Sequence, residues 1–153
     1  MSKFKTLILC ILIPLLTGIL SALISNESMQ VFSRINKPPL SPPGFLFPIV
    51  WTILYILMGI ASYIVVISND HRTDSALRVY GLQLFFNFFW SIFFFNLEWY
   101  LFSFLWLIVL WLLILLTIIR FSQINKTAGL LMIPYLLWVS FAGYLNLGIY
   151  LLN

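Results

Sequence analysis

Five long segments without Asp, Glu, Lys, Arg or His dominate this 153-residue sequence and limit what it can fold into. Each is long enough for a helix to cross a hydrocarbon core of about 30 Å. Only 8% of the residues are charged, too few to cover the surface of a water-soluble domain. The segments lack the strict alternation that a membrane barrel needs, as "FLWLIVLWLLILL" illustrates. We therefore expect an all-α membrane protein with one domain, residues 1–153, and five transmembrane helices at about 6–26, 46–68, 78–97, 102–120 and 129–151.

Lysine and arginine are divided unevenly between the two ends of such a bundle. Six lie on the side of the N-terminus and two, Arg34 and Lys37, lie on the other side. The positive-inside rule therefore predicts a cytoplasmic N-terminus and an external first loop. The N-terminal apolar segment is longer than a signal-peptide core and lacks an A-x-A-like cleavage site, so we expect a retained helix that is kinked at Pro14. Usage rich in Ile, Phe and Asn and poor in Ala favours a bacterial cell membrane.

Five of the seven prolines lie within residues 37–55. Because proline fixes φ, the segment from Pro38 to Pro43 predicts a stiff extended loop, which we expect to fold over the outer end of the bundle as a lid. Pro48 falls where a first helical turn tolerates proline. Trp51 follows one turn later, either as an interface anchor or as part of a site.

The chemistry that the spans lack excludes several classes of protein. No Asp, Glu, Lys, Arg or His lies inside them, which argues against an ion-coupled transporter and a conventional hydrolase. The single histidine, His71, lies in a short polar loop, and the single cysteine, Cys10, lies far from it in an apolar segment. We therefore expect no metal site, no disulfide and no required cofactor. The cations form no basic stripe, so a nucleic-acid partner is not expected.

Aromatic and amide side chains recur at helical spacing in the second, third and fifth predicted spans, at similar depth near the first loop. Ala142 and Gly143 remove bulk at that level. The pattern favours an apolar pocket for a flat, aromatic, hydrophobic ligand. The alternatives are an aromatic bundle core without a ligand and, for each amide, a hydrogen bond between helices. The candidate ligand-binding residues are Trp51, Tyr55, Asn87, Trp90, Ser91, Tyr135, Trp138, Ala142 and Asn146.

Three segments together resemble one family. "PPLSPPGFLFPIVWTILYILMGIASY", "LQLFFNFFWSIFFF" and "LLMIPYLLWVSFAGYLNLGIYLLN" are similar to the first loop with the second helix, the third helix and the fifth helix of the TspO/MBR family. This family comprises the tryptophan-rich sensory proteins and the translocator proteins, also called peripheral-type benzodiazepine receptors. The resemblance covers nearly the whole chain.

The resemblance implies a five-helix bundle, often a homodimer, that binds protoporphyrin and haem as well as isoquinoline carboxamide and benzodiazepine drugs. Some bacterial members promote the light- and oxygen-dependent breakdown of porphyrin through pocket tryptophans, which would here be Trp51 and Trp138. The proposed sterol motif of the family ends in a C-terminal Lys or Arg, and here none follows Lys126. For the dimer face, Gly81 has no small partner four residues on, whereas Gly18 and Ala22 have the required spacing.

These observations together predict a membrane-embedded tetrapyrrole-binding protein and sensor. Porphyrin would be its ligand or substrate, and Arg34 and Lys37 would attract the porphyrin propionates at the mouth of the pocket. The alternative is a transporter of porphyrins or of other small hydrophobic molecules. In either case the lipid bilayer is a partner.

Overall fold

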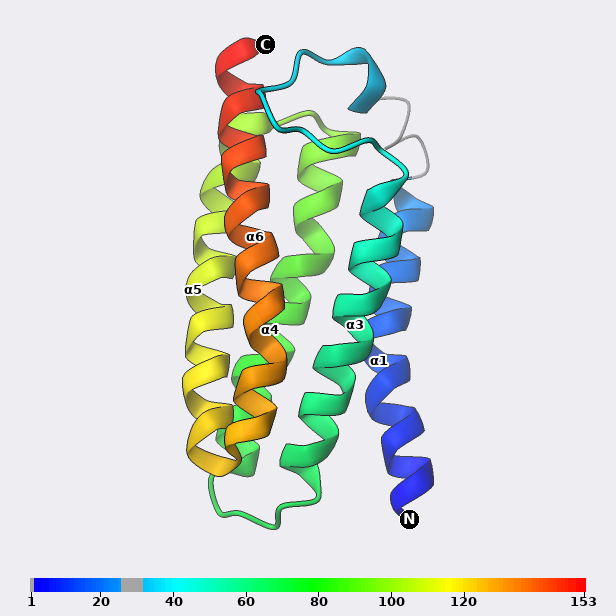
Figure 1. Ribbon diagram of the computed structural model, residues 1–153, viewed down its shortest axis with the longest axis vertical. Coiled ribbons are helices and arrows are strands. Elements are labelled where there is room, and N and C mark those ends of the chain that lie inside the picture. The colour runs from blue at the N-terminus through cyan, green and yellow to red at the C-terminus, as the bar shows by residue number, and fades with distance from the viewer. Residues whose placement is uncertain (1, 26–31) are drawn as a thin grey trace.

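The computed structural model describes residues 2–25 and 32–153, which form a bundle of five long helices (Figure 1). The elements are α1 (Lys3–Ile24), α3 (Leu46–Val66), α4 (Thr73–Ser91), a π-helical turn η1 (Ile92–Asn96), α5 (Tyr100–Ile124) and α6 (Lys126–Leu152). Within these described residues, five helices are long and apolar enough to cross a membrane, counting α4 and η1 as one, so the predicted all-α class is confirmed. The two termini lie at opposite ends of the bundle. Asn26, the last residue of the predicted first span, lies outside the described residues.

Several helices extend beyond the predicted spans, which were bounded by charged residues. Helix α4 begins at Thr73, before Arg78, and α5 continues past Arg120 to Ile124. Lysine and arginine can end a membrane span without ending the helix, because their long side chains reach polar surroundings. Arg120 donates a hydrogen bond through Nη1 to the Ser75 hydroxyl on α4. This bond joins α4 to α5 at the end of the bundle where α5 turns into α6.

Helix α1 packs closely against α3 (Figure 1). Pro14 is buried inside α1 and has no N–H for the carbonyl of Cys10, yet it does not end the helix. A Cβ built on Gly59 of α3 would lie 2.8 Å from the Cys10 oxygen and 2.6 Å from the Ile11 Cα. The missing side chain of Gly59 therefore allows the backbones of the two helices to approach, as small residues do in membrane bundles.

The proline-rich first loop crosses the end of the bundle at which the C-terminus lies (Figure 1). The Tyr144 hydroxyl donates a hydrogen bond to the Pro39 carbonyl at 2.6 Å. A Cβ on Gly148 would lie 2.6 Å from Cγ of Pro38, so this proline packs directly on the backbone of α6. The loop is thus fastened to α6 before it leads into α3.

Two asparagines also join the first loop to the C-terminal end of α6. The Asn36 N–H donates to Oδ1 of Asn153 at 3.2 Å, and Nδ2 of Asn153 donates to the Asn36 carbonyl at 2.8 Å. Pro48 lies in the first turn of α3, as the sequence predicts.

Candidate functional site

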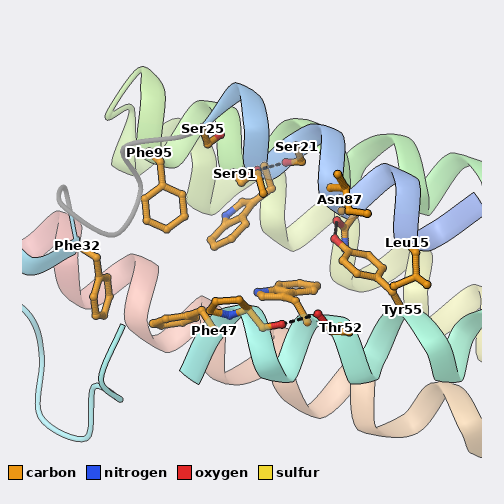
Figure 2. A pocket seen from close by; sticks show the side chains of 16 residues that line it. Leu15, Ser21, Ser25, Phe32, Phe47, Thr52, Tyr55, Asn87, Ser91 and Phe95 are labelled. Carbon is orange, nitrogen blue, oxygen red and sulfur yellow. Dashed lines mark hydrogen bonds between the residues drawn. The ribbon is translucent and has the colours of Figure 1, made fainter. Parts of the chain in front are cut away.

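A cavity of about 420 Å³ lies between α1, α3 and the region where α4 passes into η1 (Figure 2). This volume is in the range of small-molecule sites. None of the described residues that line the cavity carries a charge. The cavity lies near the end of the bundle that the first loop crosses. The 16 described residues that line it are Leu15, Gly18, Ile19, Ser21, Ala22, Ser25, Phe32, Phe47, Pro48, Trp51, Thr52, Tyr55, Asn87, Trp90, Ser91 and Phe95.

Aromatic rings make up much of the wall. Trp51 stacks on Tyr55 with 5.6 Å between ring centroids. Phe32, from the first loop, meets Phe47 edge to face at 4.9 Å. Trp90 is 8% exposed. Such a wall offers flat apolar faces on which an aromatic ligand can stack.

The π-helical turn η1 shapes part of this wall. It follows α4 immediately and spans Ile92–Asn96, and it brings Phe95 to the cavity while Phe94 packs against Tyr100. Isolated π-turns of this kind are frequent at functional sites. Periodicity in the sequence predicted an unbroken third helix and gave no sign of this turn.

A buried chain of hydrogen bonds lies along one side of the cavity and links three helices. The Tyr55 hydroxyl donates to Oδ1 of Asn87 at 2.6 Å, and Nδ2 of Asn87 donates to the Tyr135 hydroxyl at 2.7 Å. That hydroxyl donates in turn to Oε1 of Gln83 at 2.7 Å. The chain satisfies polar groups that would be costly in hydrocarbon, and it fixes the ring of Tyr55.

Asn146 makes a second buried group of hydrogen bonds. Its Oδ1 accepts from Nε1 of Trp90 at 3.0 Å and from the Ser103 hydroxyl at 3.1 Å. Its Nδ2 donates to the Tyr100 carbonyl at 2.8 Å. Asn146 is fully buried and acts here as a bridge between helices that orients Trp90.

The structure places the sequence-predicted residues in two groups. The residues predicted on the second and third spans line the cavity, and Trp51, Tyr55, Asn87, Trp90 and Ser91 all lie on its wall. Those predicted on the fifth span lie outside the lining, namely Tyr135, Trp138, Ala142 and Asn146.

The residues of α6 lie behind the wall because residues of α3 and α4 stand in front of them. Phe47 packs edge to face on Trp138, with 5.8 Å between ring centroids. Tyr135 and Asn146 bond to the wall residues Asn87 and Trp90. Nε1 of Trp138 is buried and has no hydrogen-bond partner.

The two cations predicted at the mouth differ in their surroundings. Arg34 is exposed. Nζ of Lys37 donates to the carbonyls of Phe32 at 2.8 Å and Ile35 at 3.3 Å, and it lies 5.0 Å from the centroid of the Phe32 ring. Since Phe32 lines the cavity, the Lys37 ammonium group contacts a residue of the cavity wall.

The contribution of α1 was missed from the sequence. Gly18, Ser21, Ala22 and Ser25 recur at helical spacing and all line the cavity. A Cβ on Gly18 would lie 2.3 Å from Cε2 of Tyr55, so Gly18 makes room for that ring. Gly18 and Ala22 have the spacing that a dimer face would need, and the structure places Gly18 against Tyr55 of α3, inside one chain. The small residues in "GILSALIS" were the signal, and nothing in the sequence indicated which residues face them.

At the opposite end of the bundle, the loop between α3 and α4 carries a local ion pair. Arg72 donates to the Asp70 carboxylate through Nε at 2.9 Å and Nη2 at 3.0 Å. These side-chain hydrogen bonds hold the pKa of the Asp70 carboxyl well below its usual range. His71 is exposed, with its Nδ1 3.5 Å from Asp70. Within residues 2–25 and 32–153, no group of three or more His, Cys, Asp or Glu side chains could hold a metal ion.

The fold and the site define a multi-pass integral membrane protein with an uncharged, aromatic-walled cavity. The sequence profile of the TspO/MBR family matches residues 10–152. The tryptophan-rich protein TspO of Chlorobaculum tepidum is 38% identical over 99% of this chain and 98% of its own length. The corresponding protein of Archaeoglobus fulgidus is 39% identical, with 96% of each chain covered. The translocator protein of Bos taurus is 30% identical over 88% of this chain and 82% of its own length. The chain belongs to the TspO/MBR family.

Proposed function

We propose that this protein binds and senses a tetrapyrrole of the protoporphyrin or haem type in the cavity between α1, α3 and α4. The observation that carries the proposal is the wall itself, which combines large aromatic rings with no charged side chain among the described lining residues. A flat apolar macrocycle gains free energy by leaving water and by stacking on such rings. Haem would bind without a firm axial ligand, because no His, Cys or Met is among the described lining residues and the Tyr55 hydroxyl is already bonded to Asn87.

Titration of the purified protein with protoporphyrin in the dark tests this proposal, with porphyrin absorbance and tryptophan fluorescence as readouts. We expect saturable quenching at one site per chain in the parent, and weaker binding after Trp51→Ala. Trp99→Ala is the matched control, because Trp99 is 51% exposed and does not line the cavity. Binding that Trp51→Ala and Trp99→Ala alter equally would contradict the assignment of the cavity.

The second part of the proposal is light-dependent breakdown of the bound porphyrin, with dissolved oxygen as the oxidant. It rests on the position of electron-rich indoles and not on acid–base groups. Trp51 lines the cavity, and Trp138 lies behind Phe47. We expect Trp51→Phe and Trp138→Phe to slow bleaching under light while binding in the dark survives, and bleaching to stop without oxygen. Unchanged bleaching in both variants would refute this role.

The third part of the proposal concerns the mouth. Lys37 and Arg34 would attract the propionates of the porphyrin, with a contribution of about 1 kcal/mol or less for an exposed contact. Protoporphyrin affinity at low and high salt tests this in the double variant Arg34→Gln with Lys37→Gln. Affinity equal to the parent at low salt would remove the two cations from the site.

We further propose that the same cavity takes isoquinoline carboxamide and benzodiazepine drugs, that the protein forms a homodimer, and that it lies in a bacterial cell membrane with a cytoplasmic N-terminus. Competition between such a drug and protoporphyrin tests the first point, and cross-linking in membranes tests the second. Transport is the alternative function, and flux of labelled porphyrin into proteoliposomes beyond the bound amount would favour it.

A further inference from the structure

Ser25, at the C-terminus of α1, has a buried hydroxyl group that lacks a hydrogen bond. The residue is 2% exposed and lines the cavity, and its Oγ has no partner. A buried hydroxyl without a partner costs free energy unless something else supplies the hydrogen bond. Ser25 is therefore a position where a bound molecule would gain a polar contact.

The other hydroxyl groups that line the cavity are already engaged. The Ser21 hydroxyl donates to the Phe88 carbonyl at 3.1 Å and is also hydrogen-bonded to the Ser91 hydroxyl. The Thr52 hydroxyl donates to the Pro48 carbonyl at 2.7 Å. Tyr55 donates to Asn87, as described above. Among the described residues of the wall, Ser25 thus has the one buried hydroxyl left without a hydrogen bond.

Two hydrogen bonds hold the end of α1 that carries Ser25 in place. The Ser25 N–H donates to the Ser21 carbonyl at 3.0 Å, so the backbone keeps its helical hydrogen bond. Nδ2 of Asn96, at the end of η1, donates to the Ile24 carbonyl at 2.8 Å. In Figure 2, Ser25, Ser21 and Ser91 lie across the cavity from Phe47 and Thr52 of α3. A ligand between these two sides would meet the Phe47 ring on one side and the free hydroxyl beside Phe95 on the other.

We propose that Ser25 is a specificity-determining residue that donates a hydrogen bond to a neutral acceptor on the ligand, such as the carbonyl of an ester or a protonated carboxyl group. A neutral acceptor is favoured because the described wall has no cation to compensate an ionised carboxylate. The inference rests on the proposed tetrapyrrole site and deepens it. The Ser25 hydroxyl would favour macrocycles with carbonyl-bearing side chains over purely alkyl ones. It would also direct the carbonyl-bearing edge of the ligand toward the end of α1.

Two uncharged porphyrins separate this hydrogen bond from stacking and from the charges at the mouth. Protoporphyrin dimethyl ester carries carbonyl acceptors, and etioporphyrin carries only alkyl side chains. We expect Ser25→Ala to weaken binding of the dimethyl ester about five- to tenfold, as for a neutral hydrogen bond, and to leave etioporphyrin binding within about twofold. Ser25→Thr restores the hydroxyl and should recover most of the affinity for the ester.

Ser140→Ala is the matched control, because Ser140 is an exposed serine on α6 outside the cavity. Equal losses for both porphyrins after Ser25→Ala, or no loss for the ester, would overturn the inference while the binding site stands. A parent protein that binds neither porphyrin would overturn the proposed function and the inference together.

Infrared spectra of the ester bound to the parent protein keep the test decisive if Ser25→Ala does not fold. The carbonyl stretch should move to a lower frequency than that of the ester in hydrocarbon solvent, because a donated hydrogen bond weakens the C=O bond. A bound ester whose carbonyl band stays at the hydrocarbon position would refute the contact.

Discussion

Replacement of Asn146 by leucine removes three hydrogen bonds that join α6 to α4 and α5. Leucine branches at Cγ as asparagine does and is somewhat larger, so the change removes the hydrogen bonds and keeps the position filled. The Trp90 N–H loses its acceptor at 3.0 Å, and the Ser103 hydroxyl loses one at 3.1 Å. The Tyr100 carbonyl loses its donor at 2.8 Å but still accepts from Ser103 at 3.0 Å. Trp90 is thus the group left with no partner in a buried position.

The expected magnitude follows from hydrogen bonds measured within membranes. Such bonds contribute about 0.6 kcal/mol each on average and up to about 1.7 kcal/mol. Three of them lead us to expect Asn146→Leu to lower the free energy of unfolding by about 2 kcal/mol. In the reference state, unfolded within the membrane, these groups also find partners, which is why the loss is not larger.

A double-mutant cycle isolates the Trp90 contact. Trp90→Phe removes the indole N–H, and its cost in the Asn146→Leu background should be smaller than in the parent by about 0.6–1.7 kcal/mol. Unfolding in mixed detergent micelles, followed by far-UV circular dichroism, supplies the four free energies. Trp111→Phe is the control for the loss of an indole, because its N–H bonds to Ser140 and shares no partner with Asn146. Additive effects of Trp90→Phe and Asn146→Leu would refute the bridge.

Two further predictions concern the ends of the bundle. Gly148→Ala should lower the free energy of unfolding by about 1–3 kcal/mol, because the new methyl group would overlap the Pro38 ring, whereas Gly81→Ala, with no atom within 4 Å of the added Cβ, should not. Thermal unfolding in detergent checks both, and equal midpoints for the two glycine variants would contradict the packing of the loop on α6. The ion pair with Arg72 lowers the pKa of the Asp70 carboxyl in the folded protein. The pair therefore contributes its full stability above about pH 4, the usual carboxyl pKa, and this stability is lost as the pH falls toward the lower folded pKa. Asp70→Asn should therefore show a smaller loss of thermal midpoint on acidification than the parent, and identical pH profiles would contradict the pair.

The helices could be predicted from the sequence because charge is expensive in hydrocarbon. The five segments without charge correspond to α1, α3, α4 with η1, α5 and α6. Their ends were predicted less well. Arg78 and Arg120 limited the predicted spans, yet both lie inside helices that continue past them. Charged residues in the sequence indicate where a segment leaves the hydrocarbon. The end of a helix depends instead on local capping, such as that by the Asn125 side chain at the N-terminus of α6.

The site could be predicted only in part, because depth and helical face do not decide which residue stands in front of another. The sequence placed Trp90 and Asn146 at one level, and the two are hydrogen-bonded. It left open whether the amide contacts a ligand or another helix, and in the structure Asn146 is occupied by protein partners. The wall on α1 was missed because small residues serve both close helix contacts and cavities. The contact of Gly18 with the Tyr55 ring could be learned only from the fold.

The hydrogen bonds between helices also explain how an apolar cavity can stay open inside this bundle. Empty space next to apolar side chains forfeits dispersion contacts, so unrestrained rings would turn inward and fill it. Here three of the wall's side chains are fastened to a different helix. Trp90 bonds to α6 through Asn146, Tyr55 to α4 through Asn87, and Ser91 to α1 through Ser21. Amides and hydroxyls that the sequence offered as ligand contacts thus hold the rings of the wall apart, and the ligand surface left between them is mainly aromatic.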